Sequence, residues 1–277
     1  MMPRIYSIIV LSMAIVSPTC LQTATATESA PKMLTDSIPY EGVFSFGKNK
    51  GYIKIPEDYD PKKQYPLILF FSGRGGAAST SNFTSDEFKT FREKAAQSAY
   101  IVAVPAYGSD SWFNESAENI TLEMLDFLKE KLSLSQGYYV MGCSMGGGSA
   151  LVFAAKHKEN VKAVCDVFGI TDYRRFYDEG HYRDSIAKAY GGSPTEKPQV
   201  YQDRSAISRI AALKDIPVLV IHGDKDAVVP KWNSDLFVEK LKQAKGNVEY
   251  IIVPGIGHEN RIIKNLEDRI ISFLGKQ

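Results

Sequence analysis

The sequence has little of what marks several large classes of protein. Only 3 of its 277 residues are cysteine, too few for a disulfide framework. Its 33 basic and 32 acidic residues leave a formal net charge of +1, with no basic cluster for nucleic acid and no acidic tail. The 4 histidines are far apart, without metal-ligand spacing, and no P-loop lysine motif is present. We therefore expect no metal, no cofactor and no nucleic-acid partner.

The N-terminal apolar run is too short to cross a membrane. It extends over residues 8–16, after a short basic segment, whereas a membrane span needs about 20 residues. Residues 24–26 read Ala-Thr-Ala, so we expect residues 1–26 to be a secretory signal peptide that is cleaved after Ala26. The protein is then secreted or periplasmic. The alternative is a lipoprotein cleaved before Cys20, although the three residues before it match a lipobox poorly.

Downstream of this leader, strand-like and helix-like segments alternate. Residues 27–40 are expected to form a loosely held arm, so that the folded domain covers 41–277. A hairpin is predicted over 43–55, with a glycine-bounded loop at 47–51. The apolar runs expected to form strands lie at 67–71, 100–104, 138–141, 161–168, 218–221 and 248–253, and the run at 67–71 is typical of a strand buried on both faces. The expected helices cover 87–98, 115–132, 149–157, 231–244 and 260–274.

This alternation predicts an α/β fold, namely a mostly parallel sheet with helices on both faces. The pattern lapses between 169 and 214, a polar and aromatic stretch that we interpret as a small cap-like insertion after the sixth strand. Because parallel strands end at one edge of a sheet, functional groups should gather at the carboxyl ends of these strands.

One motif at that edge has clear chemical content. Residues 142–146 read Gly-Cys-Ser-Met-Gly, between an apolar strand and a helix-like segment. Strand and helix crowd so closely at such a turn that side chains at the glycine positions would collide. The turn lifts the Ser144 hydroxyl clear of the sheet and leaves the Met145 backbone N–H free to bind an oxyanion. Taken alone, the motif could also be a glycine-rich loop with an incidental serine.

Two further segments supply partners for this serine. A serine needs a histidine to remove its proton, and the imidazole needs a carboxylate to fix its tautomer. His258 follows the last strand on a glycine-flanked loop, and Asp226 is preferred to Asp224, which is expected to cap its own turn. The other histidines are explained as a solvated helix end, a surface residue and a brace for a turn: His157, His181 and His222. The order Ser144, Asp226, His258 is that of α/β-hydrolases, not of chymotrypsin or subtilisin.

The glycine-rich loop at 73–78 has two interpretations. As Gly-x-Gly-x-x-Ala it could bind a dinucleotide, but no helix follows at once. The acidic residue expected about 20 positions later falls at Glu93, in the middle of a predicted helix. The loop is better explained as the second wall of an oxyanion hole, with the Arg74 backbone N–H as the donor. The Arg74 side chain is either solvated or reaches an acid group of the substrate.

Aromatic side chains near this edge are candidates for a substrate pocket: Trp112, Phe113, Tyr173 and Tyr177. Packing of the insertion is the alternative use of such residues. Cys143 and Cys165 should lie near the ends of neighbouring strands. We expect two buried free thiols there, with a single bridge as the alternative in an oxidising compartment.

Several of these segments resemble known families. The motifs at 142–147, 222–230 and 255–258 resemble those of the α/β-hydrolase fold. The stretches 171–174 and 190–207 are similar to the catalytic domain of the prolyl oligopeptidase (S9) family. The front of the domain, 55–73, resembles secreted esterases such as feruloyl and acetylxylan esterases. One departure is Ser72, because these families usually have a histidine before the glycine.

The motifs and the resemblance together imply a secreted serine hydrolase that cleaves a carboxylic ester. Ser144 would attack the carbonyl, His258 would shuttle the proton and Asp226 would orient His258. The Met145 and Arg74 N–H groups would hold the oxyanion, and the expected substrate is a small-molecule or saccharide-linked ester. An S9-type peptidase acting on short peptides and a non-catalytic binding protein on a hydrolase scaffold are the alternatives.

Overall fold

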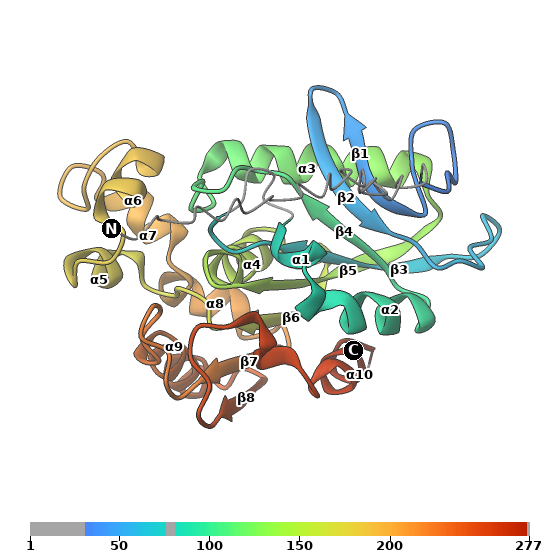
Figure 1. Ribbon diagram of the computed structural model, residues 1–277. Helices are drawn as coiled ribbons and strands as arrows, with labels where there is room; N and C mark the ends of the chain where they lie inside the picture. Colours follow the sequence, from blue (N-terminus) through green and yellow to red (C-terminus); the bar gives the residue numbers. More distant parts are fainter. Residues whose placement is uncertain (1–30, 76–80, 276–277) are drawn as a thin grey trace, which may run out of the picture. The chain divides into compact units, whose positions relative to one another are not determined.

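The computed structural model describes residues 31–75 and 81–275 (Figure 1). Contacts divide the chain into one unit over 1–30 and a second over 31–277, and the fold described below is that of the second unit. The expected signal peptide lies outside the described residues.

An eight-stranded sheet forms the centre of this unit, in the order β1-β2-β4-β3-β5-β6-β7-β8. Strands β3 to β8 are parallel to one another, whereas β2 pairs antiparallel with both β1 and β4. The strands are β1 (Glu41–Phe46), β2 (Asn49–Lys54), β3 (Tyr65–Phe71), β4 (Ile101–Pro105), β5 (Leu134–Cys143), β6 (Val161–Val167), β7 (Val218–Gly223) and β8 (Val248–Val253). The predicted, mostly parallel α/β sheet is confirmed.

Helices cover both faces of the sheet, as the alternation predicts (Figure 1). The main helices are α2 (Lys89–Gln97), α3 (Glu115–Lys131), α4 (Met145–Lys156), α9 (Trp232–Gln243) and α10 (Glu267–Gly275). The apolar sides of α3, α4 and α9 join one core cluster, and those of α2 and α10 join another on the opposite face. Leu69 of β3 belongs to the first cluster and its neighbour Phe70 to the second, so the strand is buried on both sides.

Several elements depart from the predicted boundaries, and β5 and α4 each begin four residues earlier than predicted. The β1–β2 hairpin turns over two residues, because Phe46 pairs with Asn49, so the predicted five-residue loop is wrong. The single α-helical turn α1 (Ser81–Thr84) and the 3-10 helix η1 (Asp86–Phe88) precede α2, which begins later than predicted. The last helix is in two pieces, η4 (Asn260–Ile263) and α10, and Asn265 adopts a left-handed backbone (φ 68°) between them.

Residues 31–40 are more firmly attached than the loosely held arm that the sequence predicts. Met33 forms an isolated bridge with Pro39, and the Ile55 backbone N–H donates to the Tyr40 carbonyl at 2.7 Å. Ile38 is fully buried in the first core cluster. The packed unit therefore begins before residue 41, because one apolar side chain in a polar segment is enough to anchor it.

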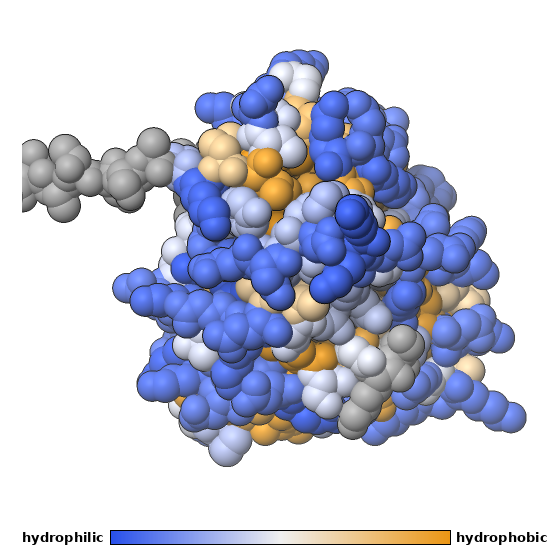
Figure 2. All heavy atoms as spheres, turned by 90° about the vertical axis from the view of Figure 1, so that its right-hand side faces the viewer, coloured by the Kyte–Doolittle hydropathy of each residue, from blue (hydrophilic) through white to orange (hydrophobic). Residues whose placement is uncertain are grey.

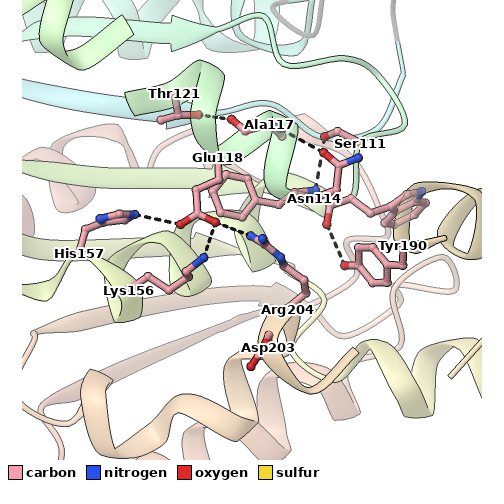
Figure 3. A network of polar contacts seen from close by, with 12 residues as sticks. Ser111, Asn114, Ala117, Glu118, Thr121, Lys156, His157, Tyr190, Asp203 and Arg204 are labelled. Carbon is pink, nitrogen blue, oxygen red and sulfur yellow. Dashed lines mark hydrogen bonds and ion pairs between the residues drawn. The ribbon is translucent and has the colours of Figure 1, made fainter. Parts of the chain in front are cut away.

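The insertion follows β6, as predicted, and contains four short helices: α5 (Tyr173–Asp178), α6 (Arg183–Tyr190), α7 (Pro198–Arg204) and α8 (Ile210–Leu213). The short 3-10 helix η3 (Ala206–Arg209) joins the last two, and η2 (Lys158–Asn160) follows α4. Glu118 of α3 fastens the insertion to the body of the unit (Figure 3). Its carboxylate accepts from Arg204 of α7 at 2.8 Å and also contacts Lys156 and His157 at the end of α4. His157 thus belongs to an ion cluster and is not merely a solvated helix end.

The side of the domain shown in Figure 2 is mostly hydrophilic, with apolar residues in small separate areas. Large apolar side chains that are exposed in the described part of the chain come from four different segments: Met33, Val43, Tyr182 and Ile252. Among residues 31–75 and 81–275, no helix has the length and apolar character needed to cross a membrane.

Candidate active site

Ser144 lies at a sharp turn between β5 and α4, at the carboxyl edge of the sheet. Its backbone has φ 57° and ψ −123°, an unfavourable conformation for a residue with a side chain. The turn is fixed by the Ser144 N–H, which donates to the Val167 carbonyl of β6 at 2.9 Å. A Cβ on Gly142 would lie 2.1 Å from the Gly146 carbonyl oxygen, so the first glycine of the motif is required by the close approach of strand and helix.

The structure brings His258 and Asp226 to this serine. His258 Nε2 lies 2.9 Å from Ser144 Oγ, and His258 Nδ1 lies 2.7 Å from Asp226 Oδ2. The Asp226 side chain is fully buried, whereas the His258 side chain keeps 18% of its surface exposed. These contacts join residues from the ends of three different strands in the order that a nucleophile, a base and an orienting acid would require.

The loop after β7 holds Asp226 in place. The other carboxylate oxygen, Oδ1, accepts from the backbone N–H groups of Val228 and Val229 at 2.9 and 2.8 Å. Burial alone would raise the pKa of Asp226, but contacts with His222 and His258 hold it well below its usual range. The Asp226 carboxyl group is therefore ionised, and its negative charge can stabilise a positive charge on the His258 imidazole.

Asp224 has a different role from the one that the sequence predicts. Its carboxylate accepts from the Gly255 backbone N–H at 2.7 Å, so it ties the loop after β7 to the loop that precedes His258. The expectation that Asp224 caps its own turn is wrong, because that capping role belongs to Asp226. Either way, Asp224 does not contact His258 in the described hydrogen-bond network.

His222 braces the same loop, as predicted. It is fully buried, its Nδ1 lies 2.7 Å from Ser234 Oγ and its Nε2 lies 2.9 Å from the Val229 carbonyl. A carbonyl only accepts, so Nε2 carries a proton, and in the neutral ring Nδ1 accepts from the serine hydroxyl. The ring therefore supports Val229, whose N–H in turn supports Asp226.

Phe168, directly after β6, lies against the imidazole of His258. The two ring centroids are 4.5 Å apart, and Phe168 is 1% exposed. Its backbone is left-handed (φ 42°), which is rare for a bulky residue. Sequence reasoning missed this residue, because an apolar residue at a strand end carries no sign of the side chain that it will contact.

A small cavity opens beside the serine and the histidine. Its volume is about 150 Å³, and it is lined by Gly73, Arg74, Cys143, Ser144, Phe168, His258 and Asn260. Arg74 thus lies next to Ser144, as expected for the second wall of an oxyanion hole. Met145 is the first residue of α4, where a backbone N–H has no partner within its own helix. Oxyanion binding by these two groups stays a prediction.

The Arg74 side chain has two partners within the protein, so it is not simply solvated. Its Nε donates to Asp110 Oδ1 at 2.5 Å, and its guanidinium carbon lies 4.9 Å from the centre of the Tyr182 ring. The Arg74 side chain is 40% exposed and that of Asp110 is 51% exposed. Asp110 is a second residue that the sequence does not single out.

The residues predicted to line a substrate pocket are not found at this cavity. Trp112, Phe113 and Tyr173 are each 1% exposed and belong to the core that joins the insertion to the sheet. Tyr177 is only partly buried, but its ring packs edge-on against Tyr201 of α7. All four side chains instead pack in the core or against other aromatic rings, which is the alternative that the sequence left open.

Cys143 and Cys165 are both buried free thiols, as expected. Burial raises the pKa of each thiol well above its usual range, so neither is a reactive thiolate. His181 is also accounted for, since its ring stacks on Phe176 with centroids 4.5 Å apart. In the described part of the chain, no group of three or more potential metal ligands is gathered at one point.

Asp166 of β6 is an unusual buried group close to the serine turn. The side chain is fully buried, and neither carboxylate oxygen makes a hydrogen bond of regular geometry within the described residues, although the Gly169 backbone N–H lies close enough to favour the charged form. A Cβ on Gly147 would lie 2.2 Å from Asp166 Oδ1, so the carboxyl group lies against the first turn of α4. Burial raises the pKa of Asp166 to about 7, although the nearby His222 opposes the rise.

The sheet and the arrangement at its edge define the class of protein, a serine hydrolase with the α/β-hydrolase fold. The sequence model of the prolyl oligopeptidase family matches residues 111–277, which is more than half of the chain. The chain therefore belongs to the prolyl oligopeptidase family, as the resemblance of its motifs implies.

Relatives of the chain include a peptidase and an esterase by name. The uncharacterized peptidase YtmA of Bacillus subtilis (strain 168) is 26% identical over 195 residues, which cover 67% of this chain and 73% of YtmA. Esterase LipC of Mycobacterium tuberculosis is 32% identical over 136 residues, which cover 43% of this chain and 34% of LipC. The chain thus spans about a third of the length of LipC.

A solved structure with a similar fold is Est1E from Butyrivibrio proteoclasticus. The TM-score is 0.63 with 19% sequence identity, over 85% of this chain and 96% of Est1E. At 19% identity the similarity shows only a shared fold. That shared fold extends over nearly the whole length of Est1E.

Proposed function

We propose that this protein is a secreted serine esterase that cleaves the carboxylic ester of a small molecule or of an acylated saccharide. The observation that carries the proposal is the pair of His258 contacts, 2.9 Å to Ser144 Oγ and 2.7 Å to Asp226 Oδ2. Ser144 Oγ attacks the ester carbonyl while His258 Nε2 takes its proton. Asp226 fixes the tautomer of His258 and stabilises the imidazolium that forms.

The remaining steps follow from the same groups. The negative charge that develops on the carbonyl oxygen is held by the backbone N–H groups of Met145 and Arg74. His258 returns its proton to the departing alkoxide, which leaves as an alcohol and gives an acyl-enzyme on Ser144. Water then attacks the acyl carbon as His258 takes its proton, and collapse releases the acid and restores the serine hydroxyl.

An ester is favoured by the size of the space beside Ser144 and by the name of one similar protein. The cavity of about 150 Å³ suits a compact acyl or alcohol group better than a peptide. LipC is an esterase by name. A second candidate function is that of an S9-type peptidase for short peptides, and the family match and the name of YtmA favour it.

We also propose that the protein is secreted or periplasmic. The support is the N-terminal sequence, with an apolar run over 8–16 and an Ala-Thr-Ala site at 24–26. Mass spectrometry of the exported protein should find a mature chain that begins at Thr27. A diacylated Cys20 would instead establish the lipoprotein alternative.

The experiment that tests the proposed activity compares the purified protein with its Ser144→Ala variant. A fluorophosphonate probe should label the natural protein and leave Ser144→Ala unlabelled, and kcat for p-nitrophenyl acetate should fall by about 10⁴-fold or more. The far-ultraviolet circular dichroism of both proteins serves as the folding control. A natural protein that neither reacts with the probe nor turns over esters would favour the non-catalytic binding protein.

A further inference from the structure

Two loops at the carboxyl edge of the sheet are joined at three points. The loop after β3 carries the predicted oxyanion donor Arg74, and the loop after β4 contains residues 106–110. Tyr107 Oη donates to the Ser72 carbonyl at 2.7 Å, and the Gly75 N–H donates to the Ser109 carbonyl at 3.2 Å. Between these two bonds, Arg74 Nε donates to Asp110 Oδ1 at 2.5 Å. The backbone at Arg74 is therefore bracketed on both sides by contacts with one neighbouring loop.

Asp110 also connects this pair of loops to the insertion. Ser185 Oγ of α6 donates to Asp110 Oδ1 at 2.9 Å, and Trp112 Nε1 donates to Ser185 Oγ at 2.7 Å. The indole N–H can only donate and the carboxylate can only accept, so the serine hydroxyl must accept from one and donate to the other. The donor and the acceptor are thus fixed for both hydrogen bonds that link Trp112, Ser185 and Asp110.

A second contact links the insertion to the same arginine. The Tyr182 ring lies 4.9 Å from the guanidinium carbon of Arg74, and Tyr182 has a left-handed backbone (φ 47°) just before α6. A guanidinium held by a carboxylate at its Nε and by an aromatic face has little freedom to rotate. Both partners of Arg74 therefore constrain the position of the loop that carries it.

Stability does not explain this arrangement. The Arg74 and Asp110 side chains are 40% and 51% exposed, and an ion pair at that exposure contributes about 0–1 kcal/mol. Position, by contrast, matters greatly beside Ser144, because a misplacement of about 1 Å can cost about a hundredfold in rate. Arg74 lines the cavity that contains Ser144 and His258.

We propose that Asp110 is a positioning residue that holds the Arg74 backbone N–H at the oxyanion site and couples the insertion to it. The proposal rests on the proposed function, in which that N–H binds the oxyanion. Asp110 acts through the Arg74 side chain and the loop, without contact to the substrate. The insertion, through Ser185 and Tyr182, then influences the rate of the reaction from outside the cavity.

The test measures kcat and KM for p-nitrophenyl acetate in Asp110→Ala and Arg74→Ala. Arg74→Ala keeps the backbone N–H, so any loss of kcat in this variant reports a displacement of the loop that carries this N–H. Each variant should lower kcat by about tenfold and change KM by less than about twofold, because the oxyanion forms only in the transition state. The double variant should be no slower than the slower single variant, because both substitutions remove the same contact.

Two further variants separate positioning from a general structural effect. Asp110→Asn keeps an acceptor oxygen for Arg74 and Ser185, so it should recover most of the kcat lost in Asp110→Ala. Ser185→Ala should lower kcat by a smaller factor, and should have no effect in the Asp110→Ala background. Asp268→Ala is the matched control, because it removes an exposed ion pair with Lys94 of 2.6 Å between α2 and α10. Its kcat should equal that of the natural protein.

The outcomes distinguish this inference from the proposed function. If the natural protein hydrolyses p-nitrophenyl acetate but Asp110→Ala keeps its kcat, the positioning role is overturned and the esterase stands. Losses of kcat that add in the double variant, or a change in KM alone, would also overturn it. A natural protein with no activity and no probe labelling would overturn the proposed function itself.

Discussion

The two carboxylate oxygens of Asp226 have different partners, and this division predicts how the residue tolerates substitution. Oδ1 accepts from two backbone N–H groups, and Oδ2 meets His258. An asparagine would place its carbonyl oxygen toward the N–H groups and its amide nitrogen toward His258 Nδ1. The imidazole would then have to accept at Nδ1 and carry its proton on Nε2, where it cannot take the proton of Ser144.

Asp226→Asn should therefore lower kcat by about 10³–10⁴-fold while the fold is retained. Asp224→Asn is the matched control, because Asp224 accepts only from the Gly255 N–H in the described network. We expect that control to change kcat by less than about tenfold. Steady-state hydrolysis of p-nitrophenyl acetate measures both, and a greater loss in Asp224→Asn would show that the acid is wrongly assigned.

Asp166 predicts a pH dependence of stability. Its pKa is raised by burial from 3.8 to about 7, so between these values the folded state holds a proton that the unfolded state has lost. Stability therefore declines as the pH rises from about 4 to about 7, by a few kcal/mol for one such group, and is constant above. Asp166→Asn should remove this decline.

Urea unfolding at pH 5 and pH 8 measures the effect of Asp166. The natural protein should lose more free energy of unfolding between the two pH values than Asp166→Asn does. Equal losses in both proteins would mean that the carboxyl group is ionised throughout and has partners that the described contacts lack.

Single residues differ in how well the sequence reveals them. Ser144, Asp226 and His258 each belong to a short local motif with a fixed place after a strand, and the structure brings the three together. Asp110 and Phe168 belong to no motif, and Asp110 meets Arg74 across 36 residues of sequence. Their roles depend on which loops the sheet order places side by side, and local patterns do not contain that information.

At the scale of whole elements, one carboxylate joins three helices. Glu118 of α3 accepts from Arg204 of α7 at 2.8 Å, lies 3.1 Å from His157 Nε2 and also contacts Lys156 of α4 (Figure 3). Burial alone would raise the pKa of Glu118, but these three partners lower it to about 2. Because the pKa of Glu118 is lower in the folded state, its ionised carboxylate stabilises the fold. This stabilisation is complete above about pH 4.5 and is lost as the pH falls toward 2.

Glu118→Gln should destabilise the protein by about 3 kcal/mol at pH 7, because it leaves two buried or half-buried cations without their carboxylate. The difference from the natural protein should shrink as the pH falls below about 4.5, because the unfolded state binds a proton there that the folded state, with a Glu118 pKa of about 2, does not yet bind. Urea unfolding at pH 7 and pH 3 measures both effects.

Asp126→Asn is the matched control for Glu118→Gln. Asp126 pairs with Lys129 on the exposed side of the same helix at 3.5 Å, and both side chains are more than half exposed. Its loss should change the free energy of unfolding by less than about 0.5 kcal/mol. A Glu118→Gln protein as stable as this control would show that the cluster does not hold the insertion.

Elements were easier to predict in the sheet than outside it. Buried parallel strands are continuous apolar runs, and all six predicted strands became β3 to β8, although the edge strand β8 is only partly buried. The helix boundaries near 86 and 264 depend on single backbone conformations, such as the left-handed Asn265, which propensity does not reveal. The aromatic residues of the insertion were assigned to a pocket because residue type indicates burial but not the partner.

At the scale of the whole molecule, the insertion is the part most relevant to the choice between ester and peptide. A peptidase that removes residues from an amino terminus needs free carboxylates to bind the ammonium group. In the insertion, Asp178 lies 3.7 Å from Arg174 and Glu179 lies 2.8 Å from Arg175. Glu179 also accepts from Trp232 Nε1 at 2.9 Å. Asp178 and Glu179 thus already have partners and are poorly placed to bind an ammonium ion, which leaves Asp184 of α6 as the one of the three acidic residues near these arginines without a described partner.

We therefore expect esters to be cleaved much faster than amides with the same acyl group. An amide nitrogen must be protonated as it departs, and positioned proton transfer of this kind is worth about 10²–10⁴-fold. The ratio of kcat/KM for p-nitrophenyl acetate to that for its anilide should reach at least this range. A dipeptide with a free amino terminus, supplied as ester and as anilide, extends the comparison to a peptidase substrate. If its anilide is turned over as fast as its ester, and N-acetylation abolishes the turnover, then the protein binds an amino terminus and is a peptidase.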